Sequence, residues 1–123
     1  FTIISNQLNN SKPLHCPDDE KRKRATQFAQ LAAKNISYFL RVDAWQTNPE
    51  LILTGDRNLC INGRPAYRLV QIDNPSIITW GPNIHKQQGN IGLVDGSAHQ
   101  VTDLMLQKAL KAHGISLNRF AIP

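Results

Sequence analysis

The chain has 123 residues, 41% of them hydrophobic and 19% charged, which is ordinary for one globular domain and excludes a disordered or cysteine-rich chain. The sequence contains no run of about 18 apolar residues, which is the pattern that would predict a membrane-spanning helix. The net charge of +5 would suit nucleic acid, but the basic run at residues 21–24 follows the acidic residues 18–20 and contains no aromatic residue for base stacking. We therefore expect a single domain over residues 1–123 without a nucleic acid partner.

The amino-terminal third predicts a short strand followed by a long helix. Residues 1–8 alternate weakly, as a strand does, and residues 12–17 form a connector because Pro17 cannot continue a strand ladder. Apolar residues then recur at helical spacing over residues 18–35, and acidic residues precede basic ones, which suits the helix dipole. The expected buried stripe consists of Ala25, Phe28, Ala29 and Ala32, with Leu31 beside them.

The middle of the chain predicts short strands separated by turns, because β-branched and aromatic residues favour strands whereas Gly, Pro, Asn and Asp favour turns. The strands expected on this basis are residues 36–42, 51–54, 59–61, 67–72 and 77–80. Asn62 and Gly63 form a strong hairpin signal, since a type I′ turn needs positive φ at both central residues. We expect this hairpin to join residues 59–61 to residues 67–72.

A second hairpin is predicted at Asp95 and Gly96, which apolar residues flank on both sides. A two-residue turn would place Ile91 opposite Gln100 and Gly92 opposite His99, with Ile91 facing the core. Asp95 and Gly96 then serve the turn itself.

The carboxyl-terminal part predicts a short helix capped by Thr102 and ended by Gly114, with an irregular tail to Pro123. The helix residues expected on one face are Leu106, Ala109, Leu110 and His113. The predicted fold class is α+β: one long amino-terminal helix packed on a short-stranded antiparallel sheet, with a short carboxyl-terminal helix.

Two alternatives remain open for the cysteines, Cys16 and Cys60. In an exported domain they could form a disulfide that closes a loop of about 45 residues. Alternatively, they are buried free thiols that behave as small apolar residues. We favour the free thiols, because nothing in the sequence brings the two Cα atoms together.

His85 is interpreted as structural, with a hydrogen bond to the backbone. A hydrolase would need a nucleophile beside it, and no local frame such as G-x-S-x-G supplies one. The strand between His85 and Asp95 would hold them on the order of 17–20 Å apart, so we expect no contact between them. The other histidines show no H-x-x-x-H spacing that would indicate a metal site.

Loop residues leave two weaker alternatives. Asp43, Asp56 and Asp73 could surround a calcium ion, but the sequence lacks a D-x-[DN]-x-[DN]-G loop, and apart from this calcium alternative we expect no cofactor. Trp45 could mark an extracytoplasmic binding module for a peptide, a glycan or a metal ion. The competing interpretation, that Trp45 fills the core under its loop, is the one we favour.

Five blocks, numbered here in chain order, carry a resemblance to a known family. They are residues 14–18 (Leu-His-Cys-Pro-Asp), residues 35–40 followed by Asp43, residues 52–58 (Ile-Leu-Thr-Gly-Asp-Arg-Asn), Trp80 with Gly81, and residues 85–96, in which His85 stands ten positions before Asp95-Gly96. In this order they resemble bacterial pilin-like proteins, the pseudopilins, that carry a prepilin-type leader and a carboxyl-terminal H-x9-DG domain. Ser97-Ala98 departs from the family, where histidine-valine is common.

The resemblance implies a non-enzymatic head domain of a subunit in a type II secretion or type IV pilus-like assembly. It also implies an upstream helix, processed by a prepilin peptidase, that anchors the subunit in the membrane and packs against other pilin-like subunits. Ser5 stands where a pilin start has glutamate, so we expect that helix to lie before Phe1. The head would lie on the periplasmic or extracytoplasmic face of the cell envelope, and no catalytic residue is implied.

Overall fold

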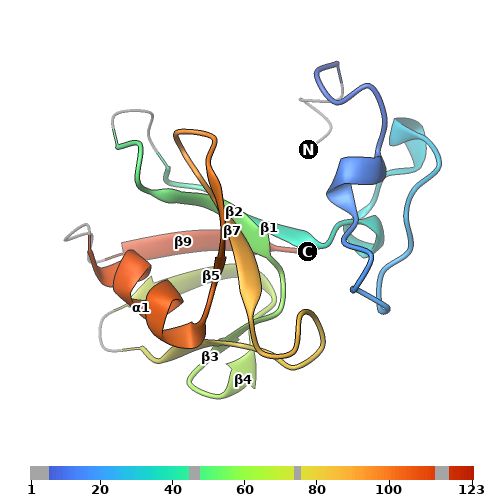
Figure 1. Ribbon diagram of the computed structural model, residues 1–123. Helices are drawn as coiled ribbons and strands as arrows, with labels where there is room; N and C mark the ends of the chain where they lie inside the picture. The colour runs from blue at the N-terminus through green and yellow to red at the C-terminus, as the bar shows by residue number, and fades with distance from the viewer. Residues whose placement is uncertain (1–5, 45–47, 74–75, 113–116) are drawn as a thin grey trace.

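The protein folds mainly into short β-strands (Figure 1). The computed structural model describes residues 6–44, 48–73, 76–112 and 117–123. The strands are β1 (Tyr38–Arg41), β2 (Ile52–Asp56), β3 (Leu59–Ile61), β4 (Arg64–Pro65), β5 (Arg68–Asp73), β6 (Ile78–Trp80), β7 (Gly89–Leu93), β8 (Ala98–Val101) and β9 (Leu117–Ile122). They form a six-stranded antiparallel sheet in the order β5-β9-β1-β2-β7-β8 and a three-stranded antiparallel sheet in the order β4-β3-β6.

The predicted α+β fold with a long amino-terminal helix is wrong. Residues 18–35 are all described, and they contain two 3₁₀ turns, η3 (Phe28–Gln30) and η4 (Ala33–Asn35), rather than an α-helix. An earlier 3₁₀ turn, η2 (Lys12–Leu14), precedes them. The described chain is therefore mostly β, with a single α-helix, α1 (Asp103–Lys111), of nine residues.

Tertiary hydrogen bonds explain why the helical pattern of residues 18–35 fails. Carbonyl groups that a helix would pair internally accept instead from distant side chains: Ser11 Oγ donates to the Ala25 carbonyl, and Asn35 Nδ2 donates to the Lys23 carbonyl. Helix propensity is a weak preference that such contacts override.

The irregular tail expected before Pro123 is a central strand instead. Strand β9 lies between β5 and β1 and pairs with both. Phe120 and Ile122 face the core, but Asn118 occupies the third inward position, and this polar residue masks the period-two pattern of a strand. Phe120 meets Phe39 of β1 edge to face, with ring centroids 5.0 Å apart.

The predicted hairpin at Asn62 and Gly63 is confirmed, with φ values of 50° and 77° in a two-residue turn that pairs Ile61 with Arg64. Its second strand is the short β4, however. Strand β5, which was expected in this hairpin, belongs to the larger sheet.

The hairpin between β7 and β8 forms with a register one residue away from the prediction. Ile91 pairs with His99 rather than Gln100, because Gly96 alone adopts positive φ, at 88°, and the connection therefore has three residues. Ile91 still faces the core, as expected, at 4% exposure.

Helix α1 confirms the predicted short carboxyl-terminal helix. The Thr102 side chain caps it by accepting a hydrogen bond from the Met105 backbone N–H. Leu106 and Leu110 are buried, and the helix packs on β6 and β8. The predicted end at Gly114 and the position of His113 lie outside the described residues.

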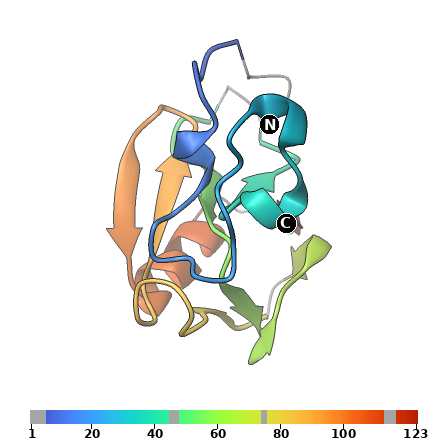
Figure 2. The same cartoon turned by 90° about the vertical axis from the view of Figure 1, so that its right-hand side faces the viewer.

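The amino-terminal segment, residues 6–37, is irregular and lies beside the carboxyl end of the chain (Figures 1 and 2). Residues 6–8 form turns, and residues 1–5 of the strand predicted there lie outside the described part. Arg22 Nη2 donates to the Pro123 carbonyl, and Asp19 forms a two-point ion pair with Arg57, both oxygen–nitrogen distances being 2.6 Å. Within the described ranges no helix has the length and apolar character to cross a membrane.

Candidate functional site

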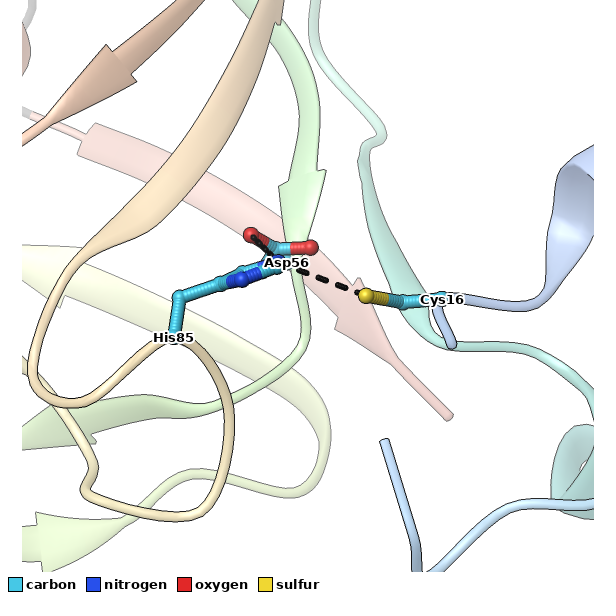
Figure 3. Close-up of side chains that lie close together, drawn as sticks. All are labelled: Cys16, Asp56 and His85. Atoms are coloured by element: carbon cyan, nitrogen blue, oxygen red, sulfur yellow. Dashed lines mark hydrogen bonds and ion pairs between the residues drawn. The ribbon is translucent and has the colours of Figure 1, made fainter. Parts of the chain in front are cut away.

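Three side chains from separate parts of the chain meet where the amino-terminal segment faces the larger sheet (Figure 3). Cys16 lies in that segment, Asp56 ends β2, and His85 lies in the loop between β6 and β7. His85 Nε2 is 3.3 Å from Cys16 Sγ and 3.5 Å from Asp56 Oδ2. One donor atom from each residue lies within 4.8 Å of the other two.

Strand pairing fixes the position of Asp56. Strand β7 runs beside β2, and Asn90 of β7 donates to Asp56 Oδ2 twice, from its backbone N–H at 2.6 Å and from its side-chain amide at 3.1 Å. Asp56 is fully buried, yet its other oxygen, Oδ1, has no hydrogen-bond partner among the described residues. The carboxylate is therefore held in place, but only one of its two oxygens accepts hydrogen bonds from the described residues.

A left-handed turn presents His85. His85, Lys86 and Gln87 have φ values of 51°, 50° and 66°, and the Gln88 N–H closes the turn on the His85 carbonyl. Such backbone costs on the order of 1–2 kcal/mol per non-glycine residue. Asn58 stabilises the entrance to this loop, since its side-chain amide donates to the carbonyls of Gly81 and Ile84.

Asp18 orients the imidazole from the other side. Its Oδ2 lies 2.8 Å from His85 Nδ1, and a carboxylate can only accept, so Nδ1 carries the proton. The other ring nitrogen, Nε2, faces Cys16 and Asp56. The sequence suggested a backbone partner for His85, whereas the ring contacts three side chains.

Burial disfavours the charged forms of both buried groups in the cluster. Burial raises the pKa of the Asp56 carboxyl, and the hydrogen bonds from Asn90 offset only part of that rise. Burial also raises the pKa of the Cys16 thiol, and the negative charge of Asp56 adds to the effect. A cation between them would reverse this preference by stabilising both anions.

Cys16, His85 and Asp18 are also the parts of a cysteine nucleophile, namely a thiol, a base and an orienting carboxylate. The reactive species in such a site is the thiolate. Cys16 is 4% exposed and its pKa is raised by burial, so the thiol form dominates. A second carboxylate, Asp56, next to the same ring nitrogen disfavours the thiolate further. The arrangement suits cation binding better than nucleophilic attack.

The cluster is reached from the surface through His85. A cleft of about 470 Å³ borders this residue, and its other walls include Asp18, Glu20, Lys86 and Asn83. Cys16 and Asp56 lie behind the imidazole and do not line the cleft. His85, with 20% of its side chain exposed, therefore separates solvent from the two buried groups.

Asp95 and Gly96 lie at the tip of the β7–β8 hairpin, away from the contacts of His85. Asp95 Oδ1 accepts from both the backbone N–H and the hydroxyl of Ser97, which lowers the pKa of Asp95. In the described part of the chain no hydrogen bond or ion pair joins His85 to Asp95. The two residues of the H-x9-DG pattern have separate partners.

Among the described residues singled out in the sequence, Cys60, Asp43 and Asp73 are not part of this cluster. Cys16 and Cys60 are both free thiols, and Cys60 lies half-buried on β3, beside Gly81. Of the acids considered for calcium, Asp43 pairs with Arg41 and Asp73 accepts from Gln71. Trp45 lies outside the described residues.

The sequence did not predict that Cys16, Asp56 and His85 lie together. Between Cys16 and Asp56 there are 39 residues, and between Asp56 and His85 there are 28, so no local spacing motif links the three. The usable signal was the resemblance, since each residue belongs to a different one of the five blocks. Comparison of the chain with protein-family models, with curated protein sequences and with solved structures gives no match.

Proposed function

We propose that this chain is a non-enzymatic head domain of a pilin-like subunit in a type II secretion or type IV pilus-like assembly. The proposal rests on the resemblance carried by the five blocks and on one structural observation that supports it. The blocks are scattered over residues 14–96 in the sequence, yet direct hydrogen bonds connect all five in space.

The first three blocks are connected through the backbone. The Ser37 N–H of the second block donates to the Leu14 carbonyl of the first at 2.9 Å. The Ser37 carbonyl in turn accepts from the Arg57 N–H of the third block, also at 2.9 Å. Ser37 is fully buried between its two partners, so this part of the segment is fixed against the end of β2.

Side chains connect the remaining two blocks to the third. The Asn58 amide donates to the Gly81 carbonyl of the fourth block at 2.8 Å, and Asn90 of the fifth block donates to Asp56. If the five blocks are a structural unit of one family, we expect them to form one connected network in space, as they do here.

The proposal places the head on the periplasmic or extracytoplasmic side of the cell envelope. Its partners are other pilin-like subunits, which a helix preceding Phe1 would contact, and that helix would also supply the membrane anchor. The long helix once expected within residues 18–35 is not part of this proposal.

Processing of the full-length protein tests the proposal. The coding sequence upstream of Phe1 should specify a basic leader, a prepilin cleavage site and roughly 20 apolar residues. Expressed with an active prepilin peptidase, the full-length protein should lose the leader, as measured by intact mass. With a catalytically inactive peptidase, which is the matched control, the mass should stay unchanged. A cytoplasmic start without an apolar segment, or the same mass in both cells, contradicts the proposal.

The second candidate is the extracytoplasmic binding module. Trp45, which would mark peptide or glycan recognition, lies outside the described residues. The cluster of Cys16, Asp56 and His85 favours a metal ion as the ligand of such a module.

A further inference from the structure

We propose that Cys16, Asp56 and His85 form a binding site for a divalent transition-metal ion, with Zn²⁺ as the best fit. The proposal does not depend on the pilin-like assignment, because it rests on the geometry and chemistry of these three side chains.

The spacing of the donor atoms fits a tetrahedral ion. Tetrahedral zinc with ordinary bond lengths places a histidine nitrogen about 3.6 Å from a cysteine sulfur and about 3.4 Å from a carboxylate oxygen. The corresponding distances from His85 Nε2 are 3.3 Å to Cys16 and 3.5 Å to Asp56. These two distances would change by only a few tenths of an ångström on binding, and the third distance, between the donor atoms of Cys16 and Asp56, is within 4.8 Å.

The kinds of donor select the class of metal. A thiolate and an imidazole suit zinc and related borderline ions, whereas calcium and magnesium prefer a shell made of oxygens. Three protein ligands with a fourth position open to solvent or ligand are typical of zinc sites that are not purely structural. Because Cys16 and Asp56 lie behind the imidazole and do not line the cleft beside His85, the ion would be bound on the buried side of the ring.

Asp18 supplies the outer partner that a metal-binding histidine needs. Ligating histidines commonly donate their other ring N–H to a carboxylate, which fixes the tautomer and raises ligand basicity. His85 makes this contact with Asp18 at 2.8 Å. The other ring nitrogen, Nε2, faces Cys16 and Asp56 and is the atom that would bind the ion.

Asp56 provides an independent reason to expect a cation. It is fully buried, and its Oδ1 has no hydrogen-bond partner among the described residues. A buried carboxylate requires pairing, protonation or coordination. Arg57, next to it in sequence, does not serve this purpose because it is bound to Asp19. An ion held by Cys16 and His85 would lie against Asp56 and neutralise it, with the thiol proton of Cys16 released to solvent.

Metal titration of the purified, reduced and untagged protein tests the site. Co²⁺ reports sulfur ligation through a thiolate-to-metal charge-transfer band and tetrahedral geometry through its visible bands, and Zn²⁺ competes with it. We expect one ion per chain, with both signals present. Cys16→Ser and His85→Gln should abolish the sulfur band or weaken binding by more than the roughly 10–100-fold loss expected for the outer-partner variant Asp18→Asn.

Cys60→Ser and His99→Gln are the matched controls, because they remove a half-buried thiol and an exposed imidazole elsewhere. Both should bind Co²⁺ as the unaltered protein does. Circular dichroism shows whether each variant folds. If Cys16→Ser does not fold, the sulfur-to-Co²⁺ band of the unaltered protein is the test of sulfur ligation. Absence of saturable binding to the unaltered protein, binding without a sulfur band, equal losses in the controls, or displacement of Zn²⁺ by equimolar Ca²⁺ would each overturn the proposal.

Discussion

Asp19 and Asp56 are both almost completely buried, but they differ in the groups that compensate their negative charge. Asp19 accepts two hydrogen bonds from Arg57, each 2.6 Å long. Among the described residues, Asp56 accepts hydrogen bonds from the neutral Asn90 and lies beside a thiol and an imidazole. The first carboxylate is therefore a stable anion that fastens the amino-terminal segment to the sheet, whereas the second is suited to respond to an added cation.

Replacing Asp19 with Asn should lower the free energy of unfolding by about 3–5 kcal/mol, because Arg57 would lose its counter-ion in a buried position. Chemical denaturation at neutral pH measures this loss. The matched control is Glu20→Gln, at an exposed neighbouring position, which should stay within about 0.5 kcal/mol of the unaltered protein. Equal effects of the two substitutions would show that the ion pair contributes little.

The pH dependence of stability should follow Asp19 in a defined direction. Burial favours the neutral acid, but the hydrogen bonds from Arg57 help to outweigh burial, so the folded-state pKa of Asp19 lies below its ordinary value. A depressed pKa contributes stability above the unfolded-state pKa, and this stability is lost as pH falls through the folded-state pKa. The difference in unfolding free energy between the unaltered protein and Asp19→Asn should thus be constant above about pH 5 and shrink in stronger acid. A difference that grows on acidification would contradict this assignment.

At the scale of single elements, glycines serve this fold in two distinct ways. Gly63 supplies a positive φ of 77° in the β3–β4 turn, and a Cβ there would meet nothing within 4 Å. Gly89, at the start of β7, has ordinary backbone, but a Cβ would lie 2.6 Å from the indole ring of Trp80. One position is constrained by its dihedral angle and the other by the close contact between β7 and β6.

Gly89→Ala should therefore cost about 1–3 kcal/mol through overpacking and should also shift the fluorescence of Trp80. The measurement needs the Trp45→Phe background, so that Trp80 is the remaining tryptophan. Gly63→Ala in the same background should cost about 1 kcal/mol through its backbone and leave the Trp80 spectrum unchanged. An unshifted spectrum in Gly89→Ala would mean that the indole does not pack on this glycine.

At the scale of the whole molecule, β9 joins the edge strand β5 to the other four strands of the larger sheet. It pairs with β5 on one side and with β1 on the other, so the end of the chain is required to complete the core. Phe120 is fully buried there, meets Phe39, and lies under the Arg41 guanidinium at 5.8 Å. Arg22 of the amino-terminal segment donates to the Pro123 carbonyl, which holds this segment beside the end of β9.

Phe120→Ala should destabilise the protein by about 3–5 kcal/mol, because it leaves a cavity at the centre of the sheet. Thermal or denaturant unfolding monitored by circular dichroism measures the change. Leu69→Ala, on the neighbouring β5 and 64% exposed, is the control and should cost far less. A loss below about 1 kcal/mol for Phe120→Ala would contradict the central position of β9.

The sequence alone determined the local features whose cause is local. Asn62 and Gly63 form the predicted turn because few residues adopt two consecutive positive φ values, and Thr102 caps α1 because its hydroxyl reaches a free backbone N–H. Five short strands in the middle of the chain form within about two residues of their predicted bounds, since β-branched and aromatic residues mark them and turn residues separate them.

Only the tertiary structure decided the features that depend on distant partners. Residues 18–35 have a helical pattern, but contacts from Ser11 and Asn35 hold their carbonyls in an irregular segment. Strand β9 was hidden because its inward Asn118 breaks the apolar alternation that marks a strand. Strand pairing positions Asp56, a left-handed turn positions His85, and the amino-terminal segment brings Cys16 to both. The contact between Cys16 and His85 spans 69 positions of sequence, so it leaves no local pattern to recognise.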